Sequence, residues 1–70
     1  MTFQEKLMAL RKQHGWSQEY LGIQIGVSRQ TINAIEKGEY NPTIKLCLKI
    51  CWALDCRLDD LFWEEKENEE

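Results

Sequence analysis

The chain has 70 residues, of which 43% are hydrophobic and 30% are charged, and its formal net charge at pH 7 is −3. This length supports one small domain, and the hydrophobic fraction is too high for a disordered chain. No run approaches the ~20 apolar residues of a transmembrane helix, and no signal peptide is recognisable, so we expect a cytoplasmic protein that does not enter a membrane.

The charge is divided unevenly along the chain. Residues 1–49 contain seven Lys or Arg against four Asp or Glu, whereas residues 50–70 contain two against eight. Affinity for phosphates depends on the local field more than on the total charge, so the basic first part is compatible with a nucleic-acid partner. The run EEKENEE at 64–70 is typical of an acidic, disordered tail, which leaves residues 1–63 as the folded domain.

The first helix is predicted by a capping box. Residues 2–5, with the sequence TFQE, match the pattern in which the first and last side chains satisfy free backbone N–H groups. The helix therefore begins at Phe3, turns Leu7 and Leu10 inward, and ends at His14-Gly15. A strand over residues 1–5 is the alternative. His14 is the only histidine and has no nearby partners for a metal site, so we place it in solvent.

The segment from Ser17 to Gly38 predicts two short helices joined by a tight turn. Ser17 and Ser28 are typical N-cap residues. Between them, Gly26 tolerates the positive φ that a sharp turn requires, and Lys37-Gly38 ends the second helix. Two capped helices with so short a connection form a helix-turn-helix unit.

The second of these helices, at about residues 28–37, has an apolar and a polar face. Ile32 and Ile35 form the apolar stripe, which packs inward. The polar face carries the candidates for base contact, Arg29, Gln30 and Asn33, and also Lys37. Arg pairs with guanine in the major groove, and Gln or Asn pairs with adenine. A plain αα-corner of a helical bundle is the alternative that spacing alone leaves open.

The run SQEYLGIQIGVSRQTINAIEKGEYNPT, residues 17–43, resembles the Cro/cI-repressor-like helix-turn-helix family, also called the XRE family, and especially its small stand-alone bacterial members. The likeness extends from about Phe3 to Phe62. It implies an all-α fold, a compact five-helix bundle of the lambda-repressor-like DNA-binding type with the helix-turn-helix at helices 2 and 3. It also implies a partly buried ion pair between Arg11 and Glu36.

Contacts to the DNA backbone are expected at the ends of the helices. The resemblance implies that Gln18 bridges a phosphate and the recognition helix, and an exposed helix-forming residue is the alternative for this position. The residues that we assign to phosphate contact are Gln18, Ser28, Lys37, Asn41 and Thr43. Tyr40 could equally be a packing residue.

The helix expected over residues 44–54, with Thr43 as its cap, is apolar on nearly every side. Its core stripe is Ile44, Cys47, Ile50, Cys51 and Leu54. A second apolar surface remains, which we interpret as a homodimer interface formed by Leu48, Trp52, Leu58, Phe62 and Trp63. Packing of these residues within the C-terminal segment alone is the alternative.

The three cysteines do not form a metal-ligating pattern. There is no C-x-x-C motif and no fourth ligand, so we interpret Cys47, Cys51 and Cys56 as small core residues rather than a metal or redox site. Two positions depart from the family pattern. Asp55 stands where a helix-ending glycine is usual and must adopt the left-handed conformation or extend the turn. Arg57 replaces the usual serine cap, so the last helix is expected to fray.

These features predict a sequence-specific transcriptional regulator, in particular a repressor, that binds double-stranded DNA at a palindromic operator as a homodimer and needs no cofactor. An interaction module, such as an antitoxin-like partner acting through the last two helices, is the alternative. We do not expect an enzyme, because no nucleophile–base constellation and no phosphate-binding glycine loop is present.

Overall fold

The computed structural model describes residues 2–62, which form five α-helices and no strand. The helices are α1 (Phe3–Gln13), α2 (Gln18–Ile25), α3 (Arg29–Glu36), α4 (Ile44–Leu54) and α5 (Leu58–Phe62). The expected five-helix, all-α architecture is therefore confirmed, and the alternative of a strand over residues 1–5 is wrong. Trp63, the tail at 64–70 and the side chain of Phe62 lie outside the described part of the chain.

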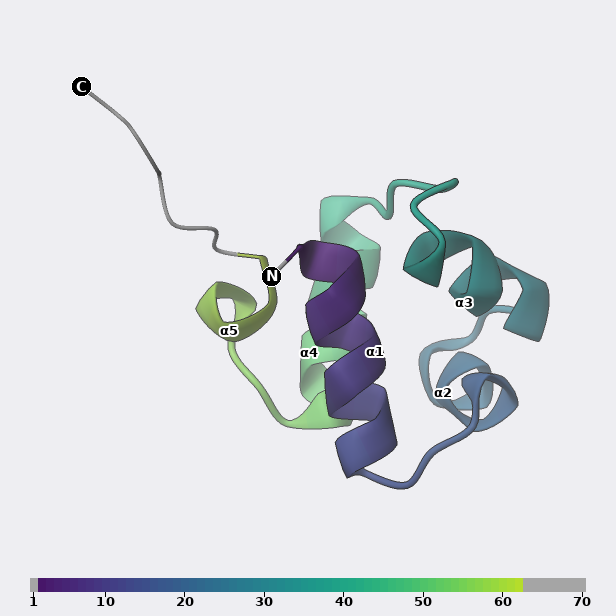
Figure 1. The fold of residues 1–70 in the computed structure, drawn as a ribbon, viewed down its shortest axis with the longest axis horizontal. Helices are drawn as coiled ribbons and strands as arrows, with labels where there is room; N and C mark the ends of the chain where they lie inside the picture. Colours follow the sequence, from purple (N-terminus) through teal and green to yellow (C-terminus); the bar gives the residue numbers. More distant parts are fainter. Residues whose placement is uncertain (1, 63–70) are drawn as a thin grey trace.

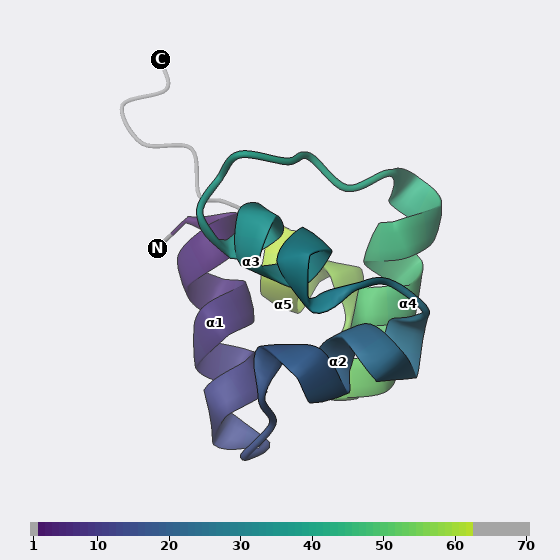
Figure 2. The same ribbon diagram turned by 90° about the vertical axis from the view of Figure 1, so that its right-hand side faces the viewer.

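The helices surround one core. In Figure 1, α1 lies in front of α4, with α5 on one side of them and α2 and α3 on the other. In the perpendicular view of Figure 2, α5 lies between α1 and α4, and it packs against both. The side chains that are fully buried come from all five helices and are Leu7, Leu21, Ile32, Ile35, Ile50, Leu54 and Leu61.

Local sequence signals set the ends of these helices. Thr2, Ser17, Ser28 and Thr43 act as N-caps, and each side chain accepts a hydrogen bond from the backbone N–H three residues further on. Such caps satisfy N–H groups that have no partner within the helix. At α5, where Arg57 stands in place of a serine cap, its backbone N–H donates to Asp60 Oδ2 at 3.1 Å.

Asp55 ends α4 in the left-handed conformation, with φ of 55°. The sequence left two possibilities for Asp55, the left-handed conformation or a longer turn, and the structure has the left-handed conformation. Asp is one of the few residues with a side chain that adopts this conformation at moderate cost. The chain then reverses and brings α5 back against α1 and α4.

One assignment to the core is wrong. Ile44 is 73% exposed, whereas Cys47, Ile50, Cys51 and Leu54 are buried as expected. Ile44 is the first residue of α4 and precedes Leu48 and Trp52 by four and eight residues. It therefore shares their outward stripe rather than the inward one.

None of the described helices combines the length and the hydropathy needed to cross a membrane.

Candidate nucleic-acid interface

The angle between α2 and α3 depends on two glycines. Gly26 ends α2 with φ of 80°, and the backbone N–H of Val27 then donates to Gly22 O at 2.9 Å. Gly22 is buried, and a Cβ at this position would lie 2.6 Å from the carbonyl oxygen of Val27. No real Cβ contact is that short, so the close approach of the turn to α2 requires glycine at position 22.

This turn directs the polar face of α3 outward. Ile32 and Ile35 are fully buried beneath the helix. Arg29 and Gln30 at its N-terminal end are exposed, and Asn33, one turn further on, is partly buried. The three residues predicted to contact bases thus lie on one helix that is anchored by its opposite side.

A buried ion pair fixes the far end of α3 to α1. Arg11 Nε donates to Glu36 Oε2 at 2.7 Å, and Arg11 Nη2 donates to Glu36 Oε1 at 3.1 Å. Arg11 Nη1 donates to the backbone oxygen of Trp16 at 2.8 Å. The residues are 8% and 6% exposed. The structure thus brings together the two residues for which the resemblance implied a partly buried pair, in the bidentate geometry that arginine and carboxylate favour.

Gln18, the first residue of α2, extends this pair toward the surface. Its Nε2 donates to Glu36 Oε1 at 3.0 Å and to Asn33 Oδ1 at 3.3 Å. The bridge from α2 to α3 is therefore present. Because both amide protons of Gln18 are donated within the protein, its backbone N–H is the group that remains to donate to a phosphate.

The other residues assigned to phosphate contact lie at helix ends and in the loop after α3. Lys37, Asn41 and Thr43 are exposed, and so is Tyr40, at 44%. Ser28 Oγ lies 3.1 Å from Thr31 Oγ1 and caps α3, and Thr43 Oγ1 caps α4. A capping hydroxyl accepts the backbone N–H through a lone pair, so the proton of Thr43 Oγ1 remains for another acceptor. The proton of Ser28 Oγ remains only when Thr31 Oγ1 is the donor in the bond between these two hydroxyls.

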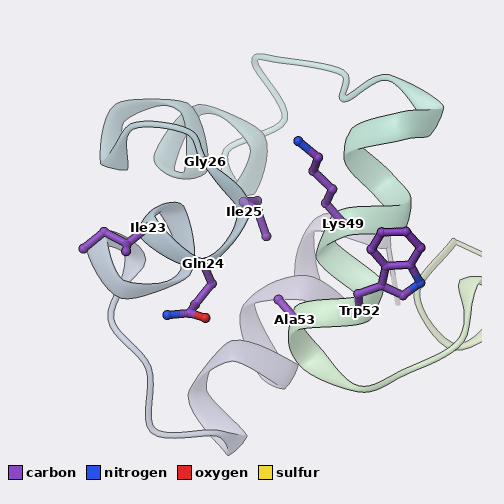
Figure 3. Close-up of a pocket in the computed structure, with 7 residues that line it drawn as sticks. All are labelled: Ile23, Gln24, Ile25, Gly26, Lys49, Trp52 and Ala53. Carbon is purple, nitrogen blue, oxygen red and sulfur yellow. The ribbon is translucent and has the colours of Figure 1, made fainter.

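The apolar residues assigned to the dimer interface on α4 and at the start of α5 differ in exposure. Trp52 is 76% exposed, Leu58 is 37% exposed, and Leu48 is half-buried. Figure 3 shows an open groove between α2 and α4, from which the Trp52 indole points away. Ile44 and Ile23 are also exposed apolar residues, and the dimer interface predicted from sequence does not include them. The spacing of Ile44 before Leu48 and Trp52 is the signal that could have identified it.

The cysteine thiols are inward and weakly acidic. Burial raises the pKa of Cys47 and of Cys51, and it raises the pKa of Cys56 to about 12. A thiol with a raised pKa is a poor nucleophile and a poor metal ligand at neutral pH. Within residues 2–62, no group of three or more His, Cys, Asp or Glu side chains could hold a metal ion.

Comparison with known families and proteins identifies the same unit. A family model described as helix-turn-helix matches residues 7–61. The HTH-type transcriptional regulator YgzD of Bacillus subtilis is 52% identical over 63 residues, which are 90% of this chain and 96% of that protein.

Solved structures give the same fold. The restriction-modification controller protein C.AhdI from Aeromonas hydrophila superposes with a TM-score of 0.82 at 35% identity, over 86% of this chain and 87% of its own. The P22 c2 repressor, solved in complex with a synthetic operator, gives 0.84 at 32% identity, over 89% of this chain and 94% of its own.

Proposed function

Because the chain belongs to the helix-turn-helix family of Cro/cI-like transcriptional regulators, we propose that it is a sequence-specific repressor that binds double-stranded DNA through α3. The observation that carries this proposal is the outward polar face of α3, held from behind by Ile32, Ile35 and the Arg11–Glu36 pair. The family is one of DNA-binding regulators and not a class of enzymes. The protein would act in the cytoplasm, together with its DNA.

In this proposal the N-terminal half of α3 enters the major groove. Arg29 and Gln30 are the exposed side chains of its first turn, and Asn33 follows on the same side one turn later. Recognition helices contact base edges with their N-terminal residues. Arg29 suits guanine, and Gln30 suits adenine, because each can form two hydrogen bonds to the base edge.

Contacts to phosphates would hold α3 in this position. The candidates surround the helix and are Gln18 through its backbone N–H, Ser28, Lys37, Asn41 and Thr43. Such contacts fix register and orientation without reading sequence. We expect them to weaken as salt rises, because bound counterions return to the DNA.

We also propose that two copies act together on a palindromic operator. The exposed apolar residues of α4 and α5 would join them, with Trp52 at the centre and Leu48 and Leu58 beside it. Phe62 and Trp63 continue this segment in the sequence. Two recognition helices would then contact successive major grooves, ~34 Å apart.

The proposal is tested by selecting tightly bound duplexes from a random pool, first with the wild-type protein and then with an Arg29→Ala/Gln30→Ala variant. We expect the wild type to enrich a palindrome with half-sites one helical turn apart, and the variant to lose or relax that preference. As a matched control, Lys12→Ala/Gln24→Ala removes one cation and one amide from exposed positions outside α3. This control variant should enrich the same DNA sequence as the wild-type protein. A folded wild-type protein that enriches no sequence would contradict the proposal and favour an interaction module.

A further inference from the structure

The Gln18 side chain connects the buried ion pair with the polar face of α3. Its Nε2 donates to Glu36 Oε1 at 3.0 Å and to Asn33 Oδ1 at 3.3 Å. A primary amide carries two N–H donors, so both are used within the protein. Only Oε1, an acceptor, remains on this side chain for an outside partner.

Glu36 determines which way the Gln18 amide is turned. Its carboxylate offers only acceptor atoms, and two hydrogen bonds from Arg11, at 2.7 and 3.1 Å, hold it in place. If the Gln18 amide were rotated by half a turn, its own oxygen would face this carboxylate with no proton between them. The carboxylate therefore selects the orientation in which Nε2 points inward.

The same constraint reaches Asn33. Because Asn33 Oδ1 accepts from Gln18, its Nδ2 is directed away from Gln18, and among residues 2–62 we find no hydrogen-bond partner for it. Asn33 is only partly buried, and it follows Arg29 by one helical turn on the polar face of α3. The group that Asn33 offers at this face is thus an N–H donor.

We propose that Asn33 is a specificity-determining residue of fixed polarity, and that Gln18 and Glu36 are its positioning residues. The inference rests on the proposed function, in which α3 reads the major groove. Asn33 Nδ2 then donates to a base acceptor, which is a purine N7, guanine O6 or thymine O4. It does not make the two-bond contact that asparagine often forms with adenine, because its Oδ1 is held toward Gln18. Cytosine, which offers only a donor in the major groove, is disfavoured.

The experiment uses the selected operator, resynthesised with single major-groove groups deleted one at a time. Binding of the wild type and of Asn33→Ala is measured on each duplex. The partner of Asn33 is the group whose deletion weakens the wild type and leaves Asn33→Ala unaffected. We expect this partner to be an acceptor, with a loss of about two- to tenfold, as for one neutral hydrogen bond. An exocyclic amino group of adenine or cytosine as the partner, or no base group at all, would overturn the proposal.

The positioning role is tested with Gln18→Met, which keeps the length of the side chain and removes its N–H donors. We expect the wild-type dependence on that one base group to disappear, because Asn33 is free to turn. Gln24→Met makes the same change at an exposed position of α2 and should leave the dependence intact. If the dependence on that base group persists in Gln18→Met, whether or not binding to all duplexes weakens, Gln18 has no positioning role.

A second variant leaves Gln18 and Glu36 unchanged. Asn33→Asp replaces the outward donor by an acceptor, so its partner should change from a base acceptor to an exocyclic amino group. An unchanged partner would contradict fixed polarity. A wild type that selects no operator would instead refute the proposed function, so the two failures are distinguishable.

Discussion

At Glu36, a carboxylate with a side chain only 2% exposed accepts hydrogen bonds from Arg11 and from Gln18. Taking a charge out of water costs several kcal/mol, and the cost is offset here because both carboxylate oxygens have partners. Such a pair adds little net stability over well-packed apolar residues. Replacing only one of the two residues costs much more stability, because the other charge then stays buried without its partner.

We therefore expect Arg11→Ala to lower the free energy of unfolding by about 3–5 kcal/mol. Urea denaturation followed by tryptophan fluorescence measures this loss. The neighbouring Lys12 is exposed, and Lys12→Ala should change the same quantity by no more than about 0.5 kcal/mol. A loss below roughly 1 kcal/mol for Arg11→Ala would mean that the pair behaves like a surface salt bridge.

Among the elements, α2 and the turn that leads to α3 are in very close contact at Gly22. The backbone that leaves α2 passes directly over Gly22, within reach of the Cβ that any other residue would carry. Since this contact sets the direction in which α3 leaves the turn, it also sets which side chains of α3 reach a ligand. A change in the packing of α2 against α3 should therefore also change how the polar face of α3 is presented to DNA.

Replacing Gly22 with alanine tests this coupling. In an open helix the change would stabilise by about 1 kcal/mol, because alanine is the better helix former. Here the added Cβ would meet the Val27 carbonyl oxygen at 2.6 Å, so we expect a net loss of about 1–3 kcal/mol in the free energy of unfolding, with weaker operator binding. Gln24→Ala, at an exposed position of the same helix, should be neutral. Equal or greater stability for Gly22→Ala would show that the turn can move aside.

The helices and their ends could be predicted from sequence because their signals are local. The capping box at residues 2–5, the serine caps and Gly26 each act over three or four residues, and all have the expected conformation. The predicted burial of Ile44 is wrong because this residue lies at the boundary between two stripes of α4. Periodicity alone does not say which stripe the neighbouring helices cover.

The hydrogen bonds of Gln18 could be predicted only in part. The resemblance implied a link from Gln18 to α3, but not its partners or its direction. Asn33 and Glu36 lie 15 and 18 residues further along the chain, and they meet Gln18 only because α2 and α3 cross at one particular angle. The choice between donor and acceptor then depends on a carboxylate that is itself held by α1. No local pattern contains that information.

At the scale of the whole molecule, two surfaces with different chemistry have to work together. The polar face of α3 offers few side chains for base contact, and the basic first part of the chain has only a modest excess of positive charge. One copy would therefore bind DNA weakly. The stripe of Ile44, Leu48 and Trp52 on α4 supplies apolar surface that a second copy could cover.

Trp52 is the side chain with which to test this arrangement. It is 76% exposed, so Trp52→Ala removes little from the core and should leave the fold intact. If Trp52 is central to the interface, its truncation should weaken self-association about 30-fold, as expected for the loss of one hot-spot side chain. Sedimentation equilibrium without DNA measures the association, and Tyr40→Ala, another exposed aromatic truncation, serves as the control.

Operator binding then connects the two surfaces. If dimerisation supplies the affinity, Trp52→Ala should keep the wild-type affinity for an isolated half-site, because α3 and its supports are unchanged. It should bind the full palindrome much more weakly than the wild type does, with an affinity close to that for the half-site. If Trp52→Ala self-associates as strongly as the wild type, the dimer interface lies elsewhere on the protein. If Trp52→Ala weakens binding to the half-site as well as to the palindrome, the substitution disturbs the position of α3 within one copy and does not act through a second copy.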